Sequence, residues 1–299
     1  MTLPKPQYFD LSHFALLEIS GDDAYTFLQG QIAGDLGLLN TAPWLFSGWC
    51  LPNGRVICTF IAFRQDHSLM LILPSMLRDK ITKRLSMFVL RSKVTIKDVS
   101  DDYALTGLHG IDVNTVIPAA VLENITVLKF SGHSPRCILI SRMDHVSDVL
   151  NAATEKCTAG ERAGWSLLDI ESGLPWILNA TTEAFLPQML NLDDMQGLSY
   201  QKGCYPGQEV IARLHYRGQL KKKLYLGTTT GQVLPGTGDR IDNQDTGEYV
   251  GDVIDAEHGA DDHIHLLAVL ETRHADNPAL RIPGLQDAPV TFQSLHYSS

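Results

Sequence analysis

Cysteine is scarce in this sequence, and its spacing excludes two common kinds of site. The 299 residues include five cysteines, no two of which form a CxxC pair. An odd number at such spacings fits neither a disulfide framework nor a zinc ribbon. We therefore expect free thiols in a reducing compartment, which predicts the cytoplasm. The five are Cys50, Cys58, Cys137, Cys157 and Cys204.

Long apolar runs are also missing. The most apolar stretch covers residues 69–73 and is broken by Pro74, far short of the about 20 residues that cross a bilayer as a helix. The opening MTLPKPQYFD has no apolar run after a basic start, although a signal peptide needs one. We expect neither a membrane partner nor secretion.

Positive charge is in deficit. Lysine and arginine number 24 against 34 aspartates and glutamates, which gives a net charge of −10. Because phosphate repels such a surface, the composition excludes nucleic-acid binding over the whole molecule and leaves only a local basic patch for it. Hydrophobic residues make up 44% of the chain and charged residues 19%. That is the composition of a folded globular protein rather than a disordered one.

The chain length predicts two domains or three small ones, and a change in sequence pattern places a boundary near residues 220–225. Before this boundary, strand patterns alternate with helical ones. From Lys223 onward, short strand patterns alternate with Gly, Asn and Asp turns at about ten-residue spacing, which predicts a small antiparallel barrel or sandwich. The helices expected in the first region cover residues 75–88, 144–157 and 163–171.

The segment Lys202-Gly-Cys-Tyr-Pro-Gly-Gln-Glu209 carries the strongest chemical signal. Apolar residues at 210, 211 and 214 predict that a helix follows and ends at Gly218. Cys204 therefore lies in a glycine-bracketed loop before a helix N-terminus, whose partial positive charge favours a thiolate, as does Lys202. The alternative is a buried Cys204 that fills space as a small apolar residue. The other four cysteines lack this setting, so we expect them to fill the core.

This segment resembles the K-G-C-[FY]-x-G-Q-E signature of the YgfZ-type folate-binding proteins. These belong to the superfamily of the glycine-cleavage T-protein, an aminomethyltransferase. An eight-residue match with flanking matches in the right order is a specific signal, and the resemblance covers most of the chain. The flanking segments that are similar to the superfamily are residues 9–13, 19–24, 27–31 with Asp35, 51–55, 169–175, 185–188 and 191–193.

The resemblance implies an α+β fold, in which two interlocked ferredoxin-like subdomains enclose a central cavity and a C-terminal antiparallel β-barrel follows. We expect the folate-binding region to cover residues 1–222 and the barrel to cover 223–299. Within the first region, the expected subdomains are 1–48 with 140–222, and 49–139.

The resemblance also implies that the cavity binds tetrahydrofolate or a one-carbon derivative. A carboxylate can accept two parallel hydrogen bonds from the donor edge of a pterin, and the superfamily's helix-end glutamate falls on Glu171. The alternative is that Glu171 only caps or solvates its helix. The expected catalytic residues are Cys204 and Lys202, and no metal is expected. The other expected contacts with folate are Trp176, Tyr205, Gln208, Glu209 and Arg213.

One departure from the T-protein pattern bears on activity. T-proteins carry a pair of aspartates just after the glycine turn of the second strand region, whereas this chain has Gly54-Arg-Val-Ile-Cys-Thr59 there. No carboxylate is present to manage the proton or the iminium charge. Ordinary aminomethyltransferase activity is therefore not expected, and whether the protein is an enzyme stays open.

The cysteine signature is characteristic of the YgfZ-like branch, which is implicated in iron–sulfur cluster assembly or repair and in tRNA modification. A thiol beside folate would carry a one-carbon unit, hold sulfur or iron, or act as a redox group, and the sequence does not choose among these. Three hypotheses stay open. They are folate-dependent chemistry at Cys204, a folate-sensing scaffold that docks to iron–sulfur assembly partners, and a divergent aminomethyltransferase.

Basic residues gather around the same cysteine. Residues 202–223 hold six lysines and arginines against Glu209, a local net charge of +5 that leaves −15 for the rest of the chain. This contrast predicts a site at Arg213 for an anion, such as the glutamate tail of folate or a phosphate. We expect the lysines at 221–223 to be solvated. Contact with tRNA through this patch has weak support, because no RNA-binding module accompanies it.

Overall fold

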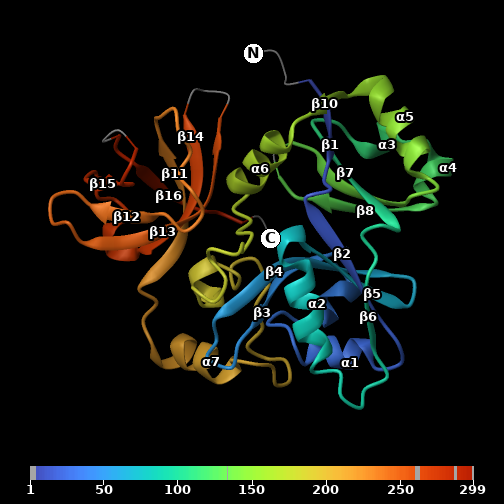
Figure 1. The fold of residues 1–299 in the computed structure, drawn as a ribbon, viewed down its shortest axis with the longest axis horizontal. Helices are drawn as coiled ribbons and strands as arrows, with labels where there is room; N and C mark the ends of the chain where they lie inside the picture. Colours follow the sequence, from blue (N-terminus) through green and yellow to red (C-terminus); the bar gives the residue numbers. More distant parts are fainter. Residues whose placement is uncertain (1–4, 133, 260–262, 286–287, 298–299) are drawn as a thin grey trace.

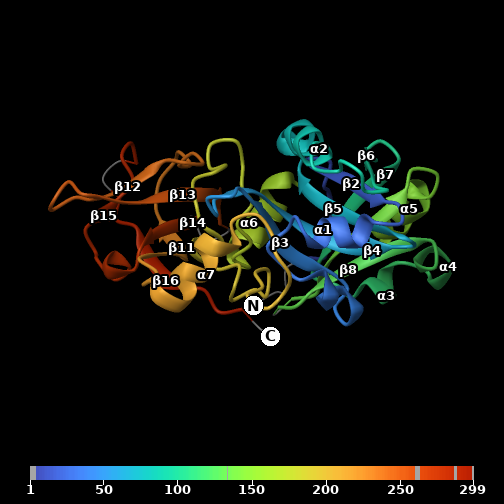
Figure 2. The same ribbon diagram turned by 90° about the horizontal axis from the view of Figure 1, so that it is seen from below.

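The computed structural model describes residues 5–132, 134–259, 263–285 and 288–297. Its strands form three sheets, which Figure 1 shows as three lobes around a common centre. Figure 2 shows the C-terminal sheet at one end of the molecule and the other two sheets at the opposite end. None of the helices in the described ranges has the length and apolar character needed to cross a membrane.

The first sheet is antiparallel and has the strand order β3-β4-β5-β2-β6. Its strands are β2 (Phe14–Ser20), β3 (Leu45–Cys50), β4 (Val56–Gln65), β5 (Ser68–Pro74) and β6 (Thr95–Asp98). The first eight residues of β4 are buried and, apart from Thr59, apolar, as expected for a strand covered on both faces. Helices α1 (Ala24–Gln29) and α2 (Arg78–Ser86) pack on one of these faces, through side chains such as Leu28 and Ile81.

The second sheet has the order β10-β1-β7-β9-β8. Its strands are β1 (Gln7–Asp10), β7 (Tyr103–His109), β8 (Ile125–Phe130), β9 (Arg136–Arg142) and β10 (Thr158–Gly160). One face is covered by helices α3 (Val113–Val116), α4 (Ala119–Leu122) and α5 (Val146–Lys156). Helix α6 (Arg162–Glu171) covers the other face, where Trp165 meets Phe9 edge-on at 5.5 Å between ring centroids.

The strand pairing corrects the expected division of the first 222 residues. We expected residues 1–48 to join 140–222, and 49–139 to form the other subdomain. Instead, β2 pairs with β5 and β6, while β7 pairs with β1 and β9. The first sheet is thus built from residues 14–98, and the second from 7–10 with 103–160. Which distant strands pair depends on long-range packing, and local patterns do not encode it.

The third sheet is the expected C-terminal antiparallel β domain, with the strand order β15-β12-β13-β14-β11-β16. Its strands are β11 (Lys222–Thr229), β12 (Arg240–Asn243), β13 (Tyr249–His258), β14 (Ile264–Glu271), β15 (Leu280–Arg281) and β16 (Thr291–Ser294). Along β14, Leu266 and Leu270 face the barrel's own core, whereas Leu267 and Val269 join a core shared with the other two sheets. Successive side chains of a strand point to opposite faces, so one face of β14 fills the barrel and the other packs against the rest of the molecule.

The expected helices lie where the sequence places them, with small shifts at their ends. The helix expected at 75–88 is a short 3-10 turn, η2 (Ser75–Leu77), that leads into α2. The helix expected to start at Pro206 or Gly207, with Gln208 and Glu209 in its first turn, is α7 (Gln208–Arg217). The connection from α6 to α7 is irregular apart from η3 (Pro187–Leu190). The remaining 3-10 turns are η1 (Leu36–Asn40) and η4 (Thr272–His274).

Candidate functional site

The loop that holds Cys204 lies against the turn between β3 and β4. Gly207 begins α7 with a left-handed φ of +83°, and a Cβ there would lie 2.5 Å from the Leu51 carbonyl oxygen and 2.6 Å from the Gly54 Cα. No side chain fits at such distances, so both the backbone angle and the close contact require glycine. Two motifs that are far apart in the sequence, residues 51–55 and 202–209, therefore meet in space.

Lys202 holds the other side of this loop. Its ammonium donates hydrogen bonds to the backbone carbonyls of Gln29, Ile32 and Gly34 after α1, at 2.9 Å for Ile32 and 2.8 Å for Gly34. Burial lowers the pKa of Lys202 to about 8, and the Asp35 carboxylate opposes this shift. Since an ammonium has three N–H donors, all of them are used. Lys202 therefore anchors the loop through all three of its N–H donors.

Tyr205 anchors the loop from the protein interior. Its ring is buried, its hydroxyl donates to the Ser199 carbonyl at 3.1 Å, and its ring centroid lies 5.2 Å from the Lys202 Nζ. Burial raises the pKa of the Tyr205 phenol, so it stays neutral at physiological pH. The side chain on either side of it in the motif, at Cys204 or Pro206, is more exposed.

Cys204 is the one exposed thiol among the five cysteines, all of which lie within the described residues. The other four are buried, as predicted for residues that fill the core. Burial raises the pKa of Cys58 and of Cys137 to about 12, and it also raises the pKa of Cys50 and Cys157. A thiol whose pKa lies so high stays protonated and unreactive at neutral pH. The structure thus leaves Cys204 as the thiol that solvent and ligands can reach.

The predicted site residues on the helix after the loop differ in their exposure to solvent. On α7, Glu209 and Arg213 are exposed and Gln208 is half-buried. Ile211 points into the core, and its carbonyl accepts a hydrogen bond of 2.8 Å from Gln188 Nε2. The 185–188 motif therefore supports α7 from inside, while the charged residues of the signature face outward.

Glu171 lies in a different neighbourhood, at the end of α6 beside the barrel. Its side chain is 45% exposed, and its Oε1 lies 3.8 Å from Nδ1 of His265 on β14. Trp176 is buried and packs at ring-centroid distances of 4.6 Å from Phe14 and 5.1 Å from Phe46. Its indole N–H donates to Asp169 Oδ2 at 2.9 Å. Trp176 thus stands within the core, and its placement gives no open ring face to a ligand.

Sequence reasoning missed the buried ion pair next to Trp176. Asp169 is fully buried and bound to Arg136 of β9, whose guanidinium also lies 4.1 Å from the ring centroid of Trp165. Burial raises the pKa of Asp169, while Arg136 lowers it. One signal was available, because Asp169 follows Trp165 by four residues and so shares its helical face. A carboxylate on a buried face needs a cation, but the sequence does not say that Arg136 supplies it.

Thr59 occupies the region where T-proteins carry their aspartates. It is buried, its hydroxyl donates to the Pro175 carbonyl at 2.8 Å, and it accepts from the Ile177 backbone N–H at 3.0 Å. This hydroxyl ties β4 to the segment after α6. It is a structural group without acid–base capacity near neutral pH.

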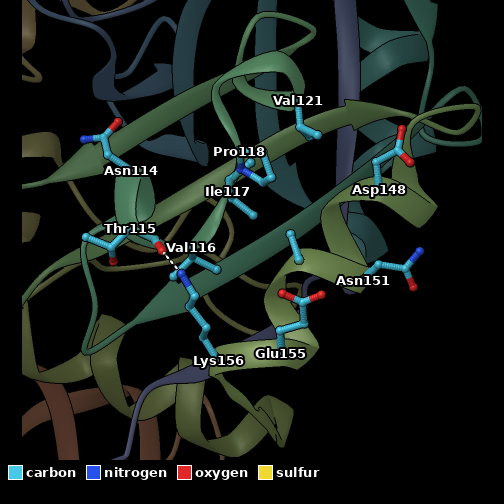
Figure 3. A pocket seen from close by; sticks show the side chains of 11 residues that line it. Asn114, Thr115, Val116, Ile117, Pro118, Val121, Asp148, Asn151, Glu155 and Lys156 are labelled. Carbon is cyan, nitrogen blue, oxygen red and sulfur yellow. Dashed lines mark hydrogen bonds between the residues drawn. The ribbon is translucent and has the colours of Figure 1, made fainter.

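A surface pocket of about 410 Å³ lies elsewhere, on the helices of the second sheet (Figure 3). The α3–α4 connection and α5 line it, and Asp148, Glu155 and Lys156 belong to its rim. Lys156 donates to the Thr115 carbonyl across one end. The residues that line this pocket include none of the predicted site residues, so we keep it apart from the Cys204 site.

One group of possible metal ligands lies in the barrel. Glu248, Glu271 and His274 bring their ligand atoms within 4.8 Å of one another. Arg273 already binds both carboxylates, at 2.7 Å to Glu271 and 2.5 Å to Glu248. Because the guanidinium balances their charge, this group is an ion-pair cluster rather than a cation site.

Comparisons with known proteins agree with this architecture. A family model described as the GCVT N-terminal domain matches residues 4–133. The tRNA-modifying protein YgfZ of Colwellia psychrerythraea is 29% identical over 99% of this chain and 94% of that protein. The protein of the same name from Klebsiella pneumoniae is 31% identical over 78% of this chain and 74% of that protein.

A solved structure shares the fold along the whole chain. It is the glycine cleavage system aminomethyltransferase T from Bartonella henselae, with a TM-score of 0.79 and 14% identity over 100% of this chain and 89% of that one. At this identity the likeness shows the fold alone. The similar proteins from Colwellia psychrerythraea and Klebsiella pneumoniae show that the chain belongs to the YgfZ family, and the solved structure shows that it has the T-protein fold.

Proposed function

We propose that this protein binds tetrahydrofolate or a one-carbon derivative and supports tRNA modification through iron–sulfur cluster assembly or repair. Relatives that match most of this chain are named tRNA-modifying proteins. The observation that carries the proposal is Cys204, an exposed thiol on a loop that Lys202 and Gly207 hold in place, while the other four thiols are buried. A single accessible thiol on a rigid loop is a suitable reactive group.

Glu171 is the residue we propose for the pterin. Its carboxylate is partly exposed, and the ion-pair partner nearest to it, His265, lies 3.8 Å away, so both oxygens can still accept hydrogen bonds. A carboxylate accepts two parallel hydrogen bonds from a pterin's donor edge. Bound folate would supply the one-carbon unit, and Glu171 would orient it. Arg213, exposed on α7, would bind the anionic glutamate tail.

Tyr205, Gln208 and Glu209 belong to the same proposed site. Tyr205 supports the loop from the core, and Gln208 and Glu209 form the first turn of α7 beside it. We assign Trp176 a supporting role, because it holds Asp169 and packs on two phenylalanines. Lys202 is a positioning residue for Cys204 in this scheme, since its three carbonyl partners use its donors.

A second candidate is a folate-sensing scaffold that docks to iron–sulfur assembly partners without turnover. The engaged ammonium of Lys202 favours it, because none of its three N–H donors is then left to hydrogen-bond the Cys204 thiol. Aminomethyl transfer is not proposed. In the region where T-proteins have aspartates, this chain has Thr59, which lacks a carboxylate. Its hydroxyl is hydrogen-bonded to the backbone of Pro175 and Ile177.

Calorimetric titration with tetrahydrofolate tests the cofactor assignment. Glu171→Ala should weaken binding by about 10- to 100-fold, because it removes a charge-assisted pair of hydrogen bonds worth about 1.5–3 kcal/mol. Glu161→Ala is the matched control, since Glu161 is exposed at the other end of the same helix. Equal affinities of wild type and Glu171→Ala would remove Glu171 from the site.

Complementation separates the reactive thiol from the scaffold. Cys204→Ala and Cys204→Ser are expressed in cells that lack the native gene, and the activity of iron–sulfur enzymes is measured. The thiol proposal predicts that neither variant restores this activity, because serine keeps the shape but not the nucleophile or the soft metal ligand. Full restoration by both variants would leave the scaffold as the explanation.

A further inference from the structure

The outward side of α7 and the strand after it carry unpaired positive charge. Residues 210–238 contain no aspartate or glutamate, although the whole chain has a net charge of −10. Arg213, Arg217 and Lys221 are exposed, and none of them forms an ion pair with any residue that the structure describes. Lys223, by contrast, is bound to Asp194 at 3.2 Å. Three exposed cations without an ion-pair partner in the described part of the chain, all in one short segment, suit an anionic partner.

Aromatic rings accompany these charges. His215 stacks on Tyr200 at 3.9 Å between ring centroids, with 20° between the planes. Tyr216 lies edge-on to His215 at 4.7 Å and is 67% exposed. Because most of the Tyr216 side chain is exposed, it offers a flat apolar face to a ligand.

Three buried polar atoms at or near Tyr200 lack hydrogen-bond partners among the described residues. The Tyr200 hydroxyl lies near Gln188 and Asp193, which both affect its pKa, yet Tyr200 OH, Gln188 Oε1 and Asp193 Oδ1 make no hydrogen bond of normal geometry among the described residues. Buried polar atoms without a partner are costly. Their burial means that a water molecule that both donates and accepts, rather than a ligand on the surface, would satisfy them.

We propose that this α7 surface, formed by Tyr200, Arg213, His215, Tyr216, Arg217 and Lys221, binds a single-stranded segment of RNA. The cations would contact successive phosphates, and unpaired bases would stack on Tyr216 and on the His215–Tyr200 pair. Alternating cations and rings fit a single strand better than a lipid surface, which needs a broader apolar face. The inference rests on the proposed role in tRNA modification only for the choice of tRNA as the RNA.

The test measures the binding of a fluorescently labelled, unmodified tRNA transcript to the full chain by anisotropy over a series of salt concentrations. Arg217→Gln with Lys221→Gln should weaken binding about tenfold at physiological salt and flatten the slope of log K against log salt by about 1.4, since each phosphate contact contributes about 0.7 for a single strand. Tyr216→Ala should weaken binding by roughly 5- to 150-fold and leave the salt slope unchanged. Arg213 is left intact because it also belongs to the proposed folate site.

The control is Lys83→Gln with Arg91→Gln, which removes the same charge from two exposed cations outside this surface. This variant should bind tRNA like wild type, and melting curves should show that every variant is folded. Equal losses in the control and in the α7 variants would overturn the proposal, as would unchanged binding in the α7 variants. Anionic phosphatidylglycerol vesicles that bind through the same residues, when tRNA does not, would also overturn it. Titrating the same variants with tetrahydrofolate measures the folate site independently of RNA binding. The failure of one proposal can therefore be told from the failure of the other.

Discussion

At the scale of single residues, burial distinguishes five chemically identical thiols. Four cysteines fill the core with thiols whose pKa burial raises, and the fifth lies on an exposed loop. The sequence predicted this division, because apolar strand patterns surround Cys50, Cys58 and Cys137. It did not predict that the Lys202 ammonium donates hydrogen bonds to three backbone carbonyls. A lysine two residues from a thiol is equally able to point toward it or away, and only the fold decides.

This division predicts a simple labelling result. In the native protein, a maleimide reagent should modify one thiol of five quickly, because only an accessible thiolate attacks it. Mass spectrometry should place the label on Cys204, and Cys204→Ser should abolish the fast phase. All thiols should react once denaturant exposes them. Fast labelling of a second cysteine in the native protein would contradict the burial described here.

At the scale of elements, local patterns predicted the helices and the β-rich C-terminal region well. The helix expected at 163–171 is α6, and the apolar positions of Ile211 and Leu214 mark α7. The partners of the strands were not predictable in this way. β1 pairs with β7, and β2 pairs with β5 and β6, across the expected boundary at residue 48, so the sheets divide the chain differently from the expected subdomains. The site shows the same limit, because its motifs predicted Cys204 but did not identify Arg136 as the partner of Asp169.

The junction between the Cys204 loop and α7 yields a prediction with an internal control. Gly207→Ala should lower the free energy of unfolding by at least about 1–3 kcal/mol, because alanine is strained at φ +83° and its Cβ would overlap the Leu51 carbonyl. Gly203→Ala, in the same loop, should change stability little, since a Cβ there meets no atom within 4 Å. Urea denaturation monitored by tryptophan fluorescence measures both. Equal stability of the two variants would mean that the loop is free to move away from the β3–β4 turn.

At the scale of the whole molecule, the three sheets share one core. Phe9 of the second sheet, Ile72 of the first and Val269 of the barrel belong to the same apolar cluster. Helix α6 packs against β13 and β14 of the barrel and so connects it to the second sheet. The motifs that resemble the T-protein superfamily come from all along the chain before the barrel, yet 51–55 and 202–209 meet only because this packing brings them together. The proposed function thus depends on the complete assembly of sheets.

The contact between α6 and the barrel should make stability depend on pH. Burial raises the pKa of Asp255 on β13 to about 7, Asp169 and Glu257 add to the shift, and Arg162 opposes it. Its pKa in the unfolded chain is about 3.9, so between these values the folded state binds more protons and stability falls as pH rises. Asp255→Asn removes this loss. Its melting temperature should therefore exceed that of wild type at pH 8 by more than at pH 5. Asp245→Asn, at an exposed aspartate of the same domain, should show the same difference from wild type at both pH values. A pH-independent difference for Asp255→Asn would mean that this carboxyl ionises normally in the folded protein.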